Sequence, residues 1–287
     1  MSTQMSSQTA TPELRQWIID QARGGHQPEA VLRSMIEAGW QEEVALATLE
    51  ETLQSFLADQ KLRAVLPEAT AVPEPALGES PSVVQAQGHE VQILLTLREP
   101  RVVVFGGLLS HAECDALIAL ARPRLARSET VDNDTGGSEV NEARTSQGMF
   151  FTRGEAELIA TIEARIAALL DWPVENGEGV QVLHYRPGAE YKPHYDYFDP
   201  AQPGTATILK RGGQRVGTVV MYLNTPTQGG ATTFPDVQLE VAPIKGNAVF
   251  FSYERAHPAT RTLHGGAPVL AGEKWVATKW LRQSRFD

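Results

Sequence analysis

Apolar residues recur with a helical period through the first sixty residues of the chain. Thr11-Pro12-Glu13 has the composition of a helix start, and Gly24-Gly25 of a helix end. The apolar stripes are Leu14, Ile18 and Ile19, then Val31, Met35 and Ile36, then Val44, Leu46, Leu49 and Leu53. We therefore predict a small three-helix bundle over residues 11–61, preceded by a disordered segment, residues 1–10.

The pattern changes over residues 62–90, which are rich in Pro, Ala and Ser. Such a composition predicts a linker with partial polyproline stiffness. The bundle before it is similar to a ubiquitin-associated-type module. We favour a docking or capping role for the bundle, and a protein partner for it is the alternative.

Short β-rich runs dominate from about Val91 onward, which places a second domain at residues 91–287. Two amphipathic helices are expected, one after Ser110 and one over residues 154–170. The expected strands are 91–97, 102–105, 180–185, 215–224, 247–251 and 275–281, separated by Gly and Pro turns. This order predicts an α+β fold, a β-sandwich or jelly-roll with helices on one sheet.

Charge and cysteine content restrict the partners of the chain. The 287 residues carry a net charge of -10 without a Lys/Arg block, which argues against nucleic acid. The single cysteine, Cys114, excludes an intramolecular disulfide and a thiolate zinc site. The N-terminus does not read as a signal peptide, and no apolar run approaches 18 residues. We expect a cytoplasmic protein without a membrane span.

A candidate metal site lies in the stretch EYKPHYDYFDP. His194 and Asp196 are two residues apart, so on a strand they point to one face. His264 follows about seventy residues later in TLHGG, and two histidines with one carboxylate form the facial triad of non-haem Fe(II) oxygenases. Lys274, ten residues past His264, offers a cation for the far end of a charged co-substrate.

The stretch 175–281 resembles the 2-oxoglutarate/Fe(II)-dependent dioxygenases, and within them the catalytic domain of prolyl 4-hydroxylases. The strings that carry the resemblance are ENGEGVQVLHYRPGAEYKPHYDYF, RVGTVVMYLNTPTQGGATTFP, VAPIKGNAVFF and TLHGGAPVLAGEKWVATKW. The resemblance implies a double-stranded β-helix core. It does not extend to the helical bundle or the linker.

The resemblance implies roles for nine residues in this stretch. His194, Asp196 and His264 would hold Fe(II), and Lys274 would pair with the remote carboxylate of 2-oxoglutarate. Tyr185 and Thr218 stand at positions for hydroxyl partners of that carboxylate, with strand packing as the alternative for each. The proline-binding positions are Tyr191, Glu178 and Trp280, which packing alone would also explain.

Two nearby features receive different interpretations. His184 flanks Tyr185, so strand alternation turns it to the opposite face and argues against a ligand role. The Pro/Gly/Thr-rich segment 198–214 follows the metal motif, and its length and position favour a mobile flap over the site, with a plain surface loop as the alternative.

The implied reaction is hydroxylation of a C–H bond with Fe(II), 2-oxoglutarate and O₂, giving succinate and CO₂. The expected target is a prolyl residue of a peptide or protein, at C4. Ascorbate is a further candidate cofactor, and the sequence leaves open whether it is needed. One alternative is a hydroxylase of another residue or of a small molecule. A non-catalytic binding protein is disfavoured because all four key positions are filled.

Overall fold

The computed structural model describes residues 9–78, 81–127, 130–131, 138–139 and 145–287. The predicted disorder of residues 1–10 falls largely outside this range. The chain divides into two compact units, Met1–Leu66 and Pro67–Asp287. None of the helices in the described ranges is long and apolar enough to span a membrane.

The first unit contains three helices, α1 (Pro12–Arg23), α2 (Pro28–Glu37) and α3 (Glu42–Val65). The hydroxyl of Thr11 caps α1 by accepting from the amide of Leu14 at 3.3 Å. The buried core consists of Ile18, Val31, Met35, Ala45 and Leu49. Ile36 and Leu46, which the apolar pattern placed in the stripe, are exposed instead.

The predicted linker, residues 62–90, differs in the structure at both of its ends. At one end α3 continues to Val65, and at the other the edge strand β1 (Val83–Ala86) pairs with β2. Between them, the amide of Thr70 donates to Glu254 and that of Glu74 to Leu170. These contacts belong to the second unit, so the segment from Pro67 onward is part of that unit's surface.

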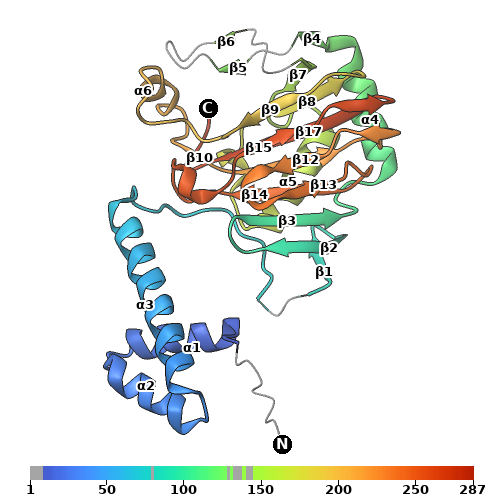
Figure 1. The fold of residues 1–287 in the computed structure, drawn as a ribbon. Coiled ribbons are helices and arrows are strands. Elements are labelled where there is room, and N and C mark those ends of the chain that lie inside the picture. Colours follow the sequence, from blue (N-terminus) through green and yellow to red (C-terminus); the bar gives the residue numbers. More distant parts are fainter. Residues whose placement is uncertain (1–8, 79–80, 128–129, 132–137, 140–144) are drawn as a thin grey trace, which may run out of the picture. The chain divides into compact units, whose positions relative to one another are not determined.

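The second unit is mixed α/β and is built on one large antiparallel sheet of nine strands (Figure 1). Strand β10 lies near its centre, paired with β14 on one side and β17 on the other. In sheet order the strands are β1, β2 (His89–Leu97), β3 (Arg101–Gly106), β14 (Ala248–Ser252), β10 (Arg215–Tyr222), β17 (Lys274–Arg282), β8 (Val180–Tyr185), β7 (Gln147–Phe151) and β4 (Ala126–Arg127).

A second sheet is formed by four short strands. Its order is β13 (Leu239–Val241), β12 (Thr232–Phe234), β15 (His264–Gly266) and β9 (Tyr191–His194). Two further strand pairs are β11 (Gln228–Gly229) with β16 (Val269–Ala271), and β5 (Thr130–Val131) with β6 (Ser138–Glu139). These strands were not predicted because each of them has only two to four residues.

Alternation along the large sheet produces two cores. On β3, Val103 and Phe105 belong to the core that includes helices α4 (His111–Ala121) and α5 (Glu157–Leu170). Val102 and Val104 belong to a second core, which includes Phe234 of the four-stranded sheet. The helices therefore cover one face of the large sheet, and the space between the two sheets lies on the other face.

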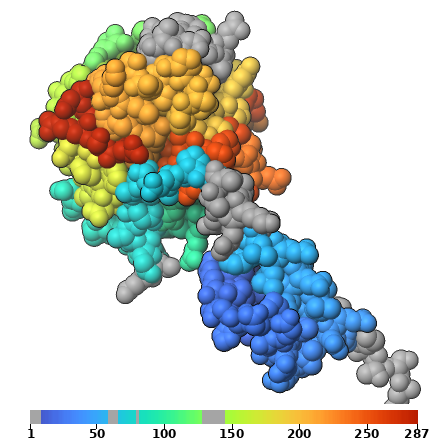
Figure 2. Space-filling model, turned by 90° about the vertical axis from the view of Figure 1, so that its left-hand side faces the viewer, coloured from blue at the N-terminus to red at the C-terminus, as the bar shows by residue number. Residues whose placement is uncertain are grey.

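The segment 198–214 contains the short helix α6 (Thr205–Ile208) and is held at both ends. The side chain of Gln214 bonds the amide and the carbonyl of Phe198, each at 2.8 Å. Arg282 donates to the carbonyls of Ile208 and Arg211. Figure 2 shows this segment as a golden patch beside the red C-terminal residues. These contacts anchor the ends of the segment, and its mobility as a flap stays a prediction.

Candidate metal centre

Strand pairing brings the two histidines of the candidate site together. His194 ends β9 and His264 begins β15, and the two residues are partners in the antiparallel register. Asp196 follows two residues after the end of β9 and is buried. The start of β15, the end of β9 and the chain just beyond β9 thus supply the three side chains.

The donor atoms of these residues face one another. His194 Nε2 lies 3.6 Å from Asp196 Oδ1, and His264 Nε2 lies 3.4 Å from Asp196 Oδ2. One ligand atom from each residue lies within 4.8 Å of the others. Among the described residues this is the group whose atoms could hold a metal ion. The spacing leaves room for one ion between the three side chains.

Each imidazole has its other nitrogen fixed by a backbone carbonyl two residues earlier. His194 Nδ1 contacts Lys192 O at 2.9 Å, and His264 Nδ1 contacts Thr262 O at 3.0 Å. A carbonyl can only accept, so both Nδ1 atoms carry the proton and both Nε2 lone pairs point at the site. This is the tautomer that a metal needs, which shows that the residues fit the ion.

Protonation also favours metal binding. Burial, and then the nearby His264, lower the pKa of His194. Burial alone would raise the pKa of Asp196, but the two histidines hold it well below its usual range. Neutral imidazole and ionised carboxylate are the forms that bind Fe(II), and the two shifts favour these forms in His194 and Asp196.

Thr218 has a different partner from the one expected. Its hydroxyl donates to Asp196 Oδ2 at 2.7 Å and lies 2.9 Å from the hydroxyl of Tyr253. With its proton on the carboxylate, Thr218 has none to give to a co-substrate. The strand pattern could not reveal this, because Asp196 reaches Thr218 only through the tertiary fold. In the structure Thr218 orients the candidate metal ligand.

The side chain of Lys274 lines the same pocket as the triad, and its charge is buried. Its ammonium lies over the rings of Tyr185 and Tyr222, 5.4 and 5.9 Å from their centroids. No anionic side chain of the described residues pairs with it, and burial lowers its pKa from 10.5 to about 8. Lys274 and Tyr185 are register partners on β17 and β8, so the structure places both residues at one end of the pocket.

Thr232 is a pocket residue that the sequence motifs do not indicate. It lines the pocket together with Lys274, and its Oγ1 accepts a hydrogen bond from Tyr222 at 2.8 Å. Its own proton can therefore be donated into the pocket. The string GGATTFP contains Thr232, but a threonine in a short strand gives no signal of such a role.

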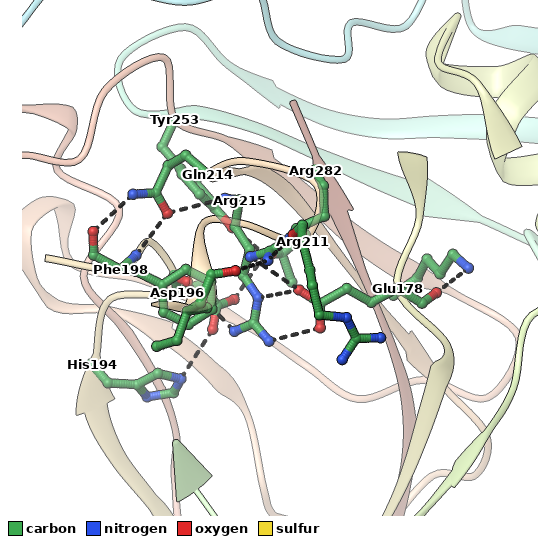
Figure 3. A network of polar contacts seen from close by, with 12 residues as sticks. Glu178, His194, Asp196, Phe198, Arg211, Gln214, Arg215, Tyr253 and Arg282 are labelled. Carbon is green, nitrogen blue, oxygen red and sulfur yellow. Dashed lines mark hydrogen bonds and ion pairs between the residues drawn. The ribbon is translucent and has the colours of Figure 1, made fainter. Parts of the chain in front are cut away.

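Glu178 does not line the pocket and has a different partner. Its carboxylate accepts two hydrogen bonds from Arg215, at 2.7 and 2.9 Å, and Arg282 approaches it at 3.6 Å (Figure 3). Such a bidentate ion pair uses both carboxylate oxygens. Arg215 in turn lies over the ring of Trp280 at 4.1 Å. Glu178 therefore contributes to the pocket wall only through Arg215 and Trp280.

The two other substrate candidates lie in the pocket. Tyr191 stacks on His194 with ring centroids 3.7 Å apart, and Trp280 lines the wall. His184 lies elsewhere: it stacks on Trp275 at 4.2 Å and contacts Glu273 Oε2 at 2.7 Å. Alternation along β8 explains why His184 stays apart while Tyr185 enters the pocket.

Comparisons with known proteins agree on one kind of enzyme. Residues 180–282, which carry the triad and Lys274, match the 2OG-Fe(II) oxygenase superfamily. The chain is 41% identical over 212 residues to prolyl 4-hydroxylase 2 of Arabidopsis thaliana, covering 66% of this chain and 69% of that protein. Prolyl 4-hydroxylase 1 of the same plant is 45% identical over 201 residues, which cover 64% of this chain and 69% of that protein. Among solved structures, a viral collagen prolyl hydroxylase from Paramecium Bursaria Chlorella virus-1 in complex with 2OG is similar, with a TM-score of 0.50 and 31% sequence identity. The match covers 63% of this chain and 95% of the viral chain.

Proposed function

Because this chain belongs to the prolyl 4-hydroxylase family of 2-oxoglutarate/Fe(II)-dependent dioxygenases, we propose that it hydroxylates proline residues in a peptide or protein. The reaction consumes 2-oxoglutarate and O₂ and gives succinate, CO₂ and hydroxyproline. The observation that carries the proposal is one pocket containing a His-Asp-His triad and a buried ammonium without an anionic partner among the described side chains.

His194, Asp196 and His264 would hold Fe(II), which supplies the oxidising chemistry when it is bound. Their ring tautomers and charges suit that ion. Three ligands leave positions for the co-substrate and O₂. The facing sheets around the triad are the jelly-roll, or double-stranded β-helix, core that we infer for the unit.

Lys274 would bind the remote carboxylate of 2-oxoglutarate while the keto-acid end faces the metal. A buried cation attracts a carboxylate strongly because little water screens the pair. The hydroxyls of Tyr185 and Thr232 are suited to share that carboxylate, since both line the pocket near Lys274. Thr218 leaves this set because it donates to Asp196.

The substrate would enter past Tyr191 and Trp280. Both rings line the pocket, and aromatic faces pack well on the apolar pyrrolidine ring of proline. The guanidinium of Arg215, which is held by Glu178, packs on the ring of Trp280 and fixes its position. Hydroxylation at C4 is the regiochemistry we propose.

For the helical unit we keep the role inferred from its sequence, a docking or capping bundle, with a protein partner as the alternative. Its exposed Ile36, Leu46 and Leu57 supply apolar surface for either role. The need for ascorbate and the cytoplasmic location also stay predictions.

An anaerobic titration tests the proposed function. Fe(II) and then 2-oxoglutarate are added to metal-free protein, and the weak visible charge-transfer band of the chelated pair is followed. We expect His264→Ala to abolish the band and Lys274→Ala to shift it to much higher 2-oxoglutarate concentrations. Folded protein without a band would contradict the proposal. Mass spectrometry of proline-containing peptides then identifies the product.

A further inference from the structure

Lys274 lies at a point where the large sheet loses one of its pairings. It is the first residue of β17, and on the β8 side it pairs with Tyr185. On the β10 side, the register ends at Tyr222 opposite Val276, and the amide of Leu223 makes a last bond to Trp275 O at 2.9 Å. The strand β10 therefore offers no further backbone partner at the level of Lys274.

The side chain of Asn224 takes the place of that missing partner. Its Nδ2 donates to Glu273 O at 2.8 Å, and its Oδ1 accepts from the amide of Trp275 at 2.7 Å. These two groups belong to the peptide units immediately before and after Lys274. A carboxamide combines an N–H donor group with a C=O acceptor, as the backbone of a neighbouring strand does. Asn224 thus holds both peptide units of Lys274.

The surroundings of the Lys274 stem make its backbone position important. A Cβ at Gly230 would lie 3.2 Å from Lys274 Cδ, so the stem runs closely past that glycine. The ammonium ends between the pocket and the rings of Tyr185 and Tyr222. Because the methylene groups of Lys274 are packed in this way, a shift of the Lys274 Cα also moves the ammonium group. Misplacement of a binding group by about 1 Å can weaken its function strongly.

We propose that Asn224 is the positioning residue for Lys274, so that it sets the affinity for the remote carboxylate of the co-substrate. This inference rests on the proposed function. Asn224 is not among the residues that line the pocket, so its effect on the co-substrate passes through Lys274. The effect should depend on the remote carboxylate and leave the metal site unchanged.

Three substitutions separate this role from general stabilisation. Asn224→Leu removes both hydrogen bonds. Asn224→Asp keeps the acceptor for the amide of Trp275 but replaces the donor to Glu273 O with a second oxygen. This variant is used for the test if Asn224→Leu does not fold. Asn247→Ala is the matched control, because Asn247 also bonds backbone with its side chain, accepting from the amide of Gly107 at 3.1 Å.

The experiment is a set of anaerobic titrations of the full-length Fe(II)-loaded protein. For Asn224→Leu we expect the 2-oxoglutarate concentration at half-saturation to rise by about tenfold or more. Loss of a residue that orients a ligand-binding group typically has an effect of this size. Fe(II) affinity should stay the same. Binding of 2-oxobutyrate, which has the chelating head but no remote carboxylate, should also stay the same. Asn247→Ala should leave all three affinities unchanged.

A double-mutant cycle completes the test. In the Lys274→Ala background, Asn224→Leu should cause no further loss of 2-oxoglutarate affinity, because the group it positions is gone. Three results would each overturn the inference. Asn224→Leu could lower 2-oxoglutarate affinity equally with and without Lys274, it could lower 2-oxobutyrate affinity as much as 2-oxoglutarate affinity, or it could leave 2-oxoglutarate affinity unchanged. If the unmodified protein does not bind 2-oxoglutarate, the proposed function fails and this inference with it.

Discussion

His194 and His264 are register partners on the antiparallel strands β9 and β15. The pairing is tight beside them, because a Cβ at Gly265 would lie 2.9 Å from Tyr191 O and 3.1 Å from Pro193 N. A glycine at such a point lets two backbones approach. The two histidines therefore depend on a residue that supplies no side-chain ligand to the metal.

Substitution of this glycine should weaken metal binding. Gly265→Ala forces β15 away from β9 and separates the imidazoles, so we expect Fe(II) affinity to fall by about tenfold or more. Gly266→Ala is the control, since its Cβ would meet nothing closer than 3.8 Å. Anaerobic Fe(II) titration measures both variants. Equal affinities in the two would show that the close approach does not position the histidines.

The hydroxyl of Thr218 should matter for the metal. Thr218→Val keeps the shape but leaves Asp196 Oδ2 without its donor, and we expect about tenfold weaker Fe(II) binding. Thr218→Ser should bind nearly as the unmodified protein does. Tyr253→Phe should have a smaller effect, because Tyr253 touches Thr218 rather than the carboxylate in this chain of hydrogen bonds. A valine variant with normal Fe(II) affinity would contradict this role.

Co-substrate affinity should fall in mild alkali. The carboxylate needs protonated Lys274, and burial lowers the pKa of that lysine to about 8. The free protein therefore loses the charge as the pH rises through about 8, and the dissociation constant should increase by up to about tenfold per pH unit above it. Lys274→Arg stays charged and should give a flat profile over this range. The same slope in both proteins would assign the loss to another group.

The ion pair of Glu178 and Arg215 should stabilise the second unit. Both side chains are largely buried, so Glu178→Ala leaves a guanidinium without its carboxylate. We expect the free energy of unfolding to fall by about 3–5 kcal/mol. Glu178→Gln keeps an acceptor and should lose less. Urea unfolding of the metal-free protein measures this, and an unchanged midpoint in the alanine variant would be the contrary result.

Removal of the helical unit should leave the chemistry intact. The triad and Lys274 all lie within Pro67–Asp287, which forms its own compact unit. A protein of residues 67–287 should bind Fe(II) and 2-oxoglutarate with the affinities of the full chain. Circular dichroism checks its folding. Lost 2-oxoglutarate turnover in a folded truncation would show that the helices contribute to the site.

The candidate site could be predicted in part because its ligands sit in short, recognisable strings. The HxD motif, the distant His264 and Lys274 fix which residues meet, and the structure brings all four to one pocket. The six-residue strand β8 was also predicted with the bounds that the structure gives. Local patterns are sufficient where the neighbour in space follows from the strand period.

The contacts that the sequence did not predict concern side chains whose partners are distant along the chain. Thr218 donates to Asp196, and Glu178 pairs with Arg215, although neither contact is visible in the linear pattern. Asn224 follows β10 and gave no signal, because its role depends on where the pairing with β17 stops. The strand β1 was assigned to the linker because only its pairing with β2 makes it a strand.

The buried ammonium of Lys274 also bears on how long the protein survives in a cell. Below about pH 8 this charge destabilises the ligand-free fold, since the unfolded chain holds the proton more tightly. A ligand that binds only the folded state stabilises it by mass action. Proteases remove chains that unfold. The abundance of this enzyme, as well as its rate, should therefore rise with the supply of 2-oxoglutarate.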